Sequence, residues 1–166
     1  MQQTSFPYLL LISEDASNDG SREICKEYAD KYSDKVRLLL HSRENNIMIN
    51  GKPSGLFNSV YSNFSITSKY IATCEADDYW TDPYSLQKRV EYLESHSDHV
   101  ICFHNSKKFH QEGQHFEEPL LPFHSSRSFD QSQIINVQVP TASIVYRNHL
   151  IDKFDPNMVK VTCGDF

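Results

Sequence analysis

The feature that most constrains the fold is an apolar run that ends abruptly in acidic residues, between Lys69 and Pro83. The run from Tyr70 to Cys74 predicts a strand that is buried on both faces of a sheet. Three carboxylates follow it, those of Glu75, Asp77 and Asp78. Because ligands of open α/β sheets bind outside the carboxyl ends of the strands, these acids are predicted to line a binding crevice.

Carboxylates this close in sequence repel one another and favour a partner cation. Mg²⁺ or Mn²⁺ suits them, because such hard ions are held by one or two carboxylates together with substrate phosphates. The alternative is a solvated acidic turn, since charged residues are mostly exposed. The aromatic residues Tyr79 and Trp80 and the helix predicted to begin at Pro83 favour the ligand-binding interpretation.

The first forty residues predict a strand–helix–strand unit. A continuous apolar run from Phe6 to Ser13 is typical of a buried parallel strand. The turn from Glu14 to Ser21 follows, in which Asp19 or Ser21 is a candidate cap for the next helix. That helix carries an apolar stripe, and a second strand is predicted at Val36 to Leu40. Such units imply an α/β fold with a parallel sheet.

The rest of the chain predicts further short elements. A long polar loop from His41 to Leu56 precedes an amphipathic helix from Leu56 to Ile66. Pro83 suits the first turn of a helix that buries Leu86, Val90 and Leu93 and ends near Ser95. The remaining predictions are a strand at 99–104, a surface excursion with a hairpin at 107–130, β structure at 134–145 and a turn-like segment at 147–157.

Composition narrows the class of protein. The formal net charge of −6 argues against a nucleic-acid-binding protein. No apolar run of membrane-spanning length and no signal peptide is visible, so no transmembrane segment is expected. The cysteines, Cys25, Cys74, Cys102 and Cys163, lie far apart, which favours reduced thiols in a cytosolic protein. The histidines match no zinc-ligand spacing.

Three segments together resemble family-two inverting glycosyltransferases of the GT-A fold, a Rossmann-like, mostly parallel sheet flanked by helices. The likeness is closest to a bacterial branch that carries a Glu-x-Asp-Asp-Tyr-Trp-Thr-Asp-Pro motif, here Glu75 to Pro83. The other segments are Ile12 to Ser21, and Pro140 to Asn148 followed by Gly164 and Asp165. The resemblance implies a single domain over 1–166, with a nucleotide-sugar-binding half at 1–104 and an acceptor-side half at 105–166.

The resemblance also implies a role for each acid. Asp15 would bind the base or ribose of a uridine-type nucleotide, and Glu75 and Asp77 would contact the nucleotide-sugar. Asp77 and Asp78 would ligate Mn²⁺ or Mg²⁺ at a DXD-type site, in which Glu75 stands where many relatives have Asp. Asp165 matches the catalytic base, which must reach the acceptor hydroxyl.

Each assignment has a structural alternative. Asp15 could be a turn or helix-capping acid, and Asp165 an ordinary surface acid. Tyr79 and Trp80 could be packing residues, and Asp82 before Pro83 is expected to cap a helix.

The chain departs from the family pattern at both ends. The usual first strand–helix unit, with its nucleotide-contacting motif, and the helix beyond the base are absent, so the polypeptide is expected to be truncated. Two functions follow as alternatives. One is a transferase that moves a sugar from a UDP-type donor to a saccharide or lipid-linked saccharide in bacterial surface-glycan synthesis, in the cytoplasm or at the inner face of the membrane. The other is a non-catalytic remnant that binds a nucleotide or a partner chain, including a second copy of itself.

Overall fold

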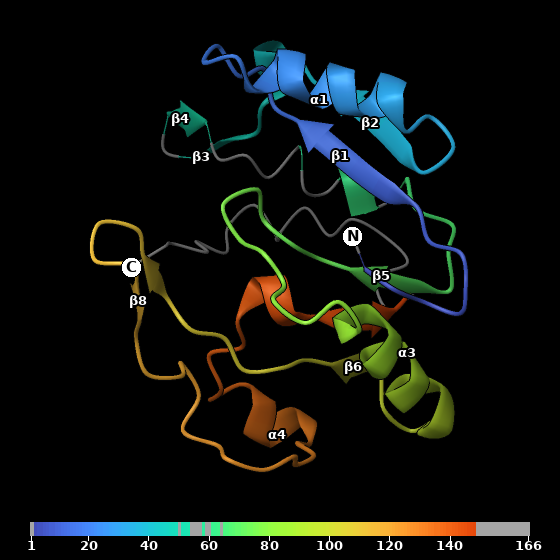
Figure 1. The fold of residues 1–166 in the computed structure, drawn as a ribbon, viewed down its shortest axis with the longest axis vertical. Helices are drawn as coiled ribbons and strands as arrows, with labels where there is room; N and C mark the ends of the chain where they lie inside the picture. Colours follow the sequence, from blue (N-terminus) through green and yellow to red (C-terminus); the bar gives the residue numbers. More distant parts are fainter. Residues whose placement is uncertain (1, 50, 54–57, 59–60, 64, 149–166) are drawn as a thin grey trace. The chain divides into compact units, whose positions relative to one another are not determined.

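The structure is a computed structural model and describes residues 2–49, 51–53, 58, 61–63 and 65–148 (Figure 1). The chain divides into two compact units. One contains residues 2–5 and the segment that begins at Ser68, and we call it the 68–148 unit after its described residues. The other contains residues 6–67 and is called the 6–67 unit.

The 6–67 unit contains the predicted strand–helix–strand motif. Strand β1 (Leu10–Glu14) pairs in parallel with β2 (Val36–Leu40), in a register that places Leu10 opposite Val36. Helix α1 (Ser21–Lys31) connects the two strands and lies along them in Figure 1. The parallel pairing and the bounds of β2 confirm the prediction, whereas β1 begins four residues later than the apolar run from Phe6.

Helix α1 begins differently from the expectation. Its N-cap is Gly20, whose φ of 95° lies in the left-handed region that glycine adopts readily. Asp19 still contributes, because its carboxylate accepts a hydrogen bond of 3.0 Å from the N–H of Ser21. No residue of α1 is buried, and Ile24 and Tyr28 of the predicted stripe are more than half exposed.

The segment after β2 contains short elements where a loop was predicted. A 3₁₀ helix, η1 (Arg43–Asn45), precedes β3 (Met48–Ile49) and β4 (Lys52–Pro53), which form an antiparallel hairpin. Of the helix predicted from Leu56 to Ile66, residues 58 and 61–63 are helical, and much of the rest lies outside the described residues.

The 68–148 unit is built on a three-stranded antiparallel sheet. Its order is β5 (Tyr70–Ala72), β9 (Val145–Arg147) and β6 (Ile101–Cys102). The expectation of a parallel neighbour for β5 is wrong for this sheet, since β9 runs antiparallel to both β5 and β6. Only the middle residue of β5, Ile71, is buried, so the expected burial on both faces is wrong as well.

Helix α3 (Ser85–Ser95) supplies the other side of the core of this unit. Leu86, Val90 and Leu93 are buried, as predicted, and the helix contacts β6 and β9. The helix begins at Ser85, two residues after Pro83, and its N-cap residue Tyr84 makes no side-chain cap. The further buried apolar residues of the unit are Ile71, Leu121 and Val145.

Gln2 caps α3 from the far end of the sequence. Its side-chain oxygen accepts a hydrogen bond of 2.9 Å from the N–H of Leu86, and its amide nitrogen donates to the carbonyl of Asp82 at 2.9 Å. Gln3 adds a main-chain hydrogen bond of 2.7 Å to the carbonyl of Pro83. The first residues therefore belong to this unit.

The segment from 103 to 144 is largely irregular. Strands β7 (Phe109–His110) and β8 (His115–Phe116) form the predicted hairpin. Helix α4 (Gln131–Ile134) is capped by Asp130, and the 3₁₀ turn η2 (Thr141–Ser143) follows it. Within the range 134–145, where β structure was predicted, only Val145 is in a strand, β9, so the prediction is wrong for the rest of that range. Among the described residues, no helix has the length and apolar character needed to cross a membrane.

Candidate functional site

The acidic turn that follows β5 presents its carboxylates to solvent. Glu75, Asp77 and Asp78 are all exposed, and the turn is closed by a hydrogen bond of 3.1 Å from the N–H of Asp78 to the carbonyl of Glu75. Neither the Asp77 nor the Asp78 carboxylate makes a hydrogen bond or ion pair with any residue that the structure describes. As far as the described residues are concerned, both side chains are therefore available to a ligand.

The residues on either side of this turn are anchored to η2. Before it, the Thr73 hydroxyl donates a hydrogen bond of 2.7 Å to the carbonyl of Thr141. After it, the Trp80 indole N–H donates a hydrogen bond of 2.6 Å to the carbonyl of Ala142. The main-chain N–H of Thr73 adds a bond of 3.2 Å to the carbonyl of Ile144. Both ends of the acidic turn are thus fixed to one short segment.

The Arg89 guanidinium lies over the face of the Trp80 ring. Its side chain is buried, and the guanidinium carbon is 4.5 Å from the centre of the indole ring. It donates to the carbonyl of Ser85 at 3.0 Å and to the carbonyl of Ser143 at 2.5 Å. Burial lowers the pKa of Arg89 to about 10, so the side chain stays charged at neutral pH.

One nitrogen of Arg89, Nη2, is buried and has no hydrogen-bond partner among the residues that the structure describes. No carboxylate among the described residues pairs with this guanidinium. The positive charge is compensated by main-chain carbonyls and by the face of Trp80, an interaction that stabilises buried arginine side chains. Among the described residues, the carboxylates of Asp77 and Asp78 therefore form no ion pair with Arg89.

Cys74 is a poor ligand for a hard cation, because thiol sulfur suits soft metals. Although Cys74 is exposed overall, partial desolvation of its thiol raises the thiol pKa, and the negative charges of Asp78 and Glu75 raise it further. The protonated thiol donates a weak hydrogen bond of 3.7 Å to the carbonyl of Asp78. Metal chemistry at this turn would therefore depend on carboxylate oxygens.

Those oxygens fit a hard divalent ion better than a closed protein cage. The described residues contain no group of three or more His, Cys, Asp or Glu side chains arranged around a common ion position. A Mg²⁺- or Mn²⁺-type site does not need one, because such ions take one or two carboxylates and complete their shell with phosphates and water. The exposed pair Asp77 and Asp78 has the right donor chemistry for this arrangement.

His104 lies at the same edge of the sheet as the acidic turn. Strands β5 and β6 both run antiparallel to β9, so they point the same way, and His104 follows β6 as the acids follow β5. Burial lowers the pKa of His104 below its ordinary value. One ring nitrogen, Nδ1, is 2.7 Å from the carbonyl oxygen of Asn105.

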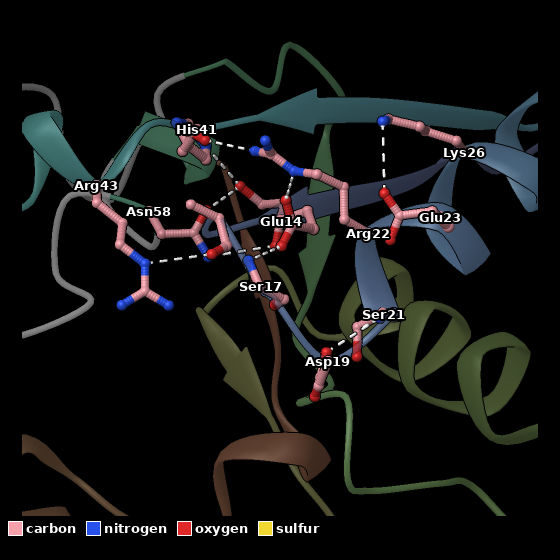
Figure 2. A network of polar contacts seen from close by, with 12 residues as sticks. Glu14, Ser17, Asp19, Ser21, Arg22, Glu23, Lys26, His41, Arg43 and Asn58 are labelled. Carbon is pink, nitrogen blue, oxygen red and sulfur yellow. Dashed lines mark hydrogen bonds and ion pairs between the residues drawn. The ribbon is translucent and has the colours of Figure 1, made fainter.

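In the 6–67 unit, Asp15 follows β1 directly. Its carboxylate accepts a hydrogen bond of 3.3 Å from the Asn46 side chain, next to η1. The Arg43 side chain donates to the carbonyl of Ala16 at 3.3 Å, so the segment that contains η1 lies against this turn (Figure 2). Ala16 has a φ of 58°, an uncommon value for a residue other than glycine.

The buried acid of this turn is Glu14, which the sequence did not single out. Its carboxylate accepts hydrogen bonds from the N–H of Ser17, at 2.5 Å, and from the Arg22 guanidinium, with which it forms an ion pair (Figure 2). Burial acts to raise the pKa of Glu14, and the bonds from Ser17 and Arg22 outweigh it, so the pKa lies below its ordinary value. Glu14 therefore shapes the turn that presents Asp15.

His41, Ser13 and Asn58 complete this polar network. The Arg22 guanidinium also donates to the carbonyl of His41 at 2.5 Å, and the Ser13 hydroxyl is 2.9 Å from the His41 ring nitrogen Nε2. Ser13 and Asn58 are joined by two hydrogen bonds. A polar residue at the last position of an apolar strand, followed by an arginine in the next helix, is the signal that would have indicated this network.

The structure thus brings Glu75, Asp77 and Asp78 together in one turn. Asp15 belongs to the other unit, and its meeting with the acidic turn stays a prediction. Asp165 lies outside the described residues. Asp82, which was expected to cap a helix, is not the N-cap residue of α3, which is Tyr84. Its carboxylate accepts a hydrogen bond of 2.9 Å from the N–H of Tyr84 and pairs with Lys88 at 2.7 Å.

An α/β chain with acids at strand ends matches a known family of transferases. The model of glycosyl transferase family 2 matches residues 1–154, and the chain belongs to this family. An uncharacterized protein of Mycobacterium tuberculosis is 37% identical over 147 residues, which cover 88% of this chain and 40% of that protein.

Two further relatives carry glycosyltransferase names. EpsE of Bacillus subtilis, named as a glycosyltransferase, is 33% identical over 92 residues, or 55% of this chain and 30% of EpsE. A Nostoc protein named as a glycosyltransferase is 24% identical over 163 residues, or 94% of this chain and 47% of that protein. The chain therefore spans less than half the length of these relatives. No solved structure matches it significantly.

Proposed function

We propose that this chain is the donor-binding part of an inverting, metal-dependent glycosyltransferase. The observation that carries the proposal is the pair of exposed carboxylates, Asp77 and Asp78, at the end of β5 in a chain of glycosyl transferase family 2. The donor is a nucleotide-diphospho-sugar, most simply of the UDP type, and the acceptor is a hydroxyl of a saccharide or lipid-linked saccharide. A role in bacterial surface-glycan synthesis, at the cytoplasmic side of the membrane, is part of the same proposal.

The chain's own residues would divide the work between binding and proton transfer. Asp77 and Asp78 would hold Mn²⁺ or Mg²⁺, with Glu75 beside them, and Asp15 would accept hydrogen bonds from the base or ribose of the nucleotide. The bound ion supplies neutralisation of the charge that develops on the departing nucleoside diphosphate. The acceptor oxygen bonds to the anomeric carbon as the bond from that carbon to the diphosphate breaks, and Asp165 takes the hydroxyl proton.

The experiment that tests this function is calorimetric titration of the chain with UDP and UDP-sugars, with and without Mn²⁺. We expect nucleotide binding that requires the metal and that is lost in Asp77→Asn and Asp78→Asn. Absence of metal-dependent binding for every nucleoside diphosphate tested would overturn the proposal. Metal-dependent binding without sugar transfer or donor hydrolysis would instead identify a non-catalytic nucleotide-binding chain.

A further inference from the structure

Three neighbouring carbonyls of η2 accept hydrogen bonds from three side chains around the acidic turn. The carbonyls are those of Thr141, Ala142 and Ser143, and the donors are Thr73, Trp80 and Arg89, at distances of 2.7, 2.6 and 2.5 Å. We call this set of six residues the carbonyl latch. Thr73 precedes the acidic turn and Trp80 follows it. The Arg89 guanidinium stacks on the face of the Trp80 ring.

The latch opposes a specific instability. Acids as close in sequence as Glu75, Asp77 and Asp78 repel one another when ionised, and the turn that carries them is exposed. A free turn would relieve this repulsion by spreading apart. Fixing both ends to one short segment prevents the spreading while leaving the carboxylates of Asp77 and Asp78 without partners among the described residues.

Arg89 indicates that the arrangement serves more than packing. Within the described part of the chain, the buried Arg89 guanidinium has no carboxylate partner and one unpartnered nitrogen, an arrangement that destabilises a fold. An apolar side chain of similar volume at this position would avoid that destabilisation. Arginine, however, places one donor on Ser143 and a flat cation against the Trp80 ring at the same time.

We propose that Thr73, Trp80 and Arg89 are positioning residues that hold the acidic turn in the arrangement that binds metal and nucleotide. The inference rests on the proposed function for the identity of the ligand. It states that hydrogen bonds to the carbonyls of η2 fix the conformation of the acidic turn. The segment that contains η2 would thereby control the affinity of the acidic turn after β5 for metal and nucleotide.

The test uses the full chain with substitutions that delete single latch bonds. Thr73→Val removes the hydroxyl at constant shape, and Trp80→Phe removes the indole N–H while keeping an aromatic ring over Arg89. Ser68→Ala is the matched control, because the Ser68 hydroxyl also donates a 2.7 Å bond to a carbonyl, that of Tyr70, at the other end of β5. Thr73→Ser restores the hydroxyl and serves as the rescue.

The first measurement is hydrogen–deuterium exchange without any ligand. We expect faster exchange confined to residues 74–79 in Thr73→Val and Trp80→Phe, and wild-type exchange there in Ser68→Ala and Thr73→Ser. Unchanged exchange at 74–79 would overturn the latch. Equal acceleration throughout the 68–148 unit would also overturn it, because the bonds would then support the fold in general.

The second measurement is the dissociation constant of Mn²⁺ in the presence of UDP, at a temperature where circular dichroism shows every variant folded. Loss of a partner that orients metal ligands commonly weakens metal binding by about 10-fold or more, and we expect a change of about that size for each latch variant. Values within two-fold of Ser68→Ala would contradict the positioning role. If the wild-type chain binds no Mn²⁺ with UDP, the proposed function fails, and the exchange measurement still decides whether the latch exists.

Discussion

Arg22 and Glu14 form an ion pair beneath the turn that presents Asp15, and the Glu14 carboxylate is almost completely buried. The pair joins the end of β1 to the first turn of α1, and Arg22 continues to the carbonyl of His41 just after β2. One arginine therefore fastens together the three elements of the strand–helix–strand motif.

Replacing Glu14 by glutamine should destabilise the 6–67 unit by about 2 kcal/mol, because the charged partner of Arg22 is lost from a buried position. Urea unfolding followed by circular dichroism measures the change. Glu23→Gln is the control, since Glu23 is an exposed acid of the same helix whose contact with Lys26 is 3.9 Å long. Equal losses in the free energy of unfolding for the two substitutions would show that the buried ion pair stabilises the unit no more than the exposed one.

The same pair makes stability depend on pH. Burial alone would raise the pKa of Glu14, but the bonds from Ser17 and Arg22 lower it below its unfolded value. The stabilisation is therefore complete above the unfolded pKa of about 4.3 and is lost as the pH falls through the lower folded pKa. We expect the wild-type chain to lose more stability than Glu14→Gln below about pH 4. If the difference in the free energy of unfolding between the two proteins stays constant from pH 6 to pH 3, this assignment is contradicted.

Replacing Asp78 by asparagine should weaken the binding of Mn²⁺ with UDP by at least about 10-fold, because a neutral amide oxygen is a poorer ligand for a hard cation. Calorimetry gives the dissociation constants. Glu118→Gln removes one negative charge from an exposed position of the same unit and controls for net charge. A similar loss of affinity in both variants would mean that Asp78 acts only through long-range electrostatics.

Gln2→Ala should destabilise the 68–148 unit by about 1 kcal/mol, because α3 loses the side chain that accepts the N–H of Leu86. Thermal unfolding of the two variants Gln2→Ala and Gln3→Ala makes a close comparison. Gln3 bonds to the carbonyl of Pro83 through its main-chain N–H, which alanine keeps. Only the first variant should therefore lower the melting temperature.

Arg147→Lys should destabilise the same unit by about 2 kcal/mol although it keeps the charge. The Arg147 guanidinium donates to the carbonyls of His99, Leu93 and His96 and to the Tyr70 hydroxyl, which a single ammonium group cannot reproduce. Arg127→Lys is the control, since Arg127 is exposed and rests on the Phe123 ring. Chemical unfolding that ranks the two variants equally would refute the role of Arg147 as a hub.

The parts of the fold that sequence predicted well are those set by local periodicity. The apolar run of β2 and the stripe of Leu86, Val90 and Leu93 were sufficient, because neighbouring residues determine which face of a strand or helix is buried. The acidic turn was likewise identified from adjacent residues. The exposure of Asp77 and Asp78 is compatible with both the ligand-binding interpretation and the solvated acidic turn, so metal binding stays a prediction.

The parts that sequence could not predict depend on partners far along the chain. Nothing in Tyr70 to Ala72 indicates that β9, more than seventy residues later, is its antiparallel neighbour. Glu14 and Asp15 are adjacent acids, and only the positions of Arg22 and Asn46 decide which is buried and which is presented. The same applies to Gln2, whose role depends on α3.

The late position of β9 in the sequence has a consequence for synthesis of the chain. Because Val145 to Arg147 lie between β5 and β6 in the sheet, neither strand can complete its ladder on the ribosome before residue 147 has emerged. Until then the nascent polypeptide exposes Ile71 and the apolar side of α3 to the translation machinery. Contacts between segments so far apart in sequence also form slowly, so the apolar surface of this unit stays uncovered longest before β9 is in place.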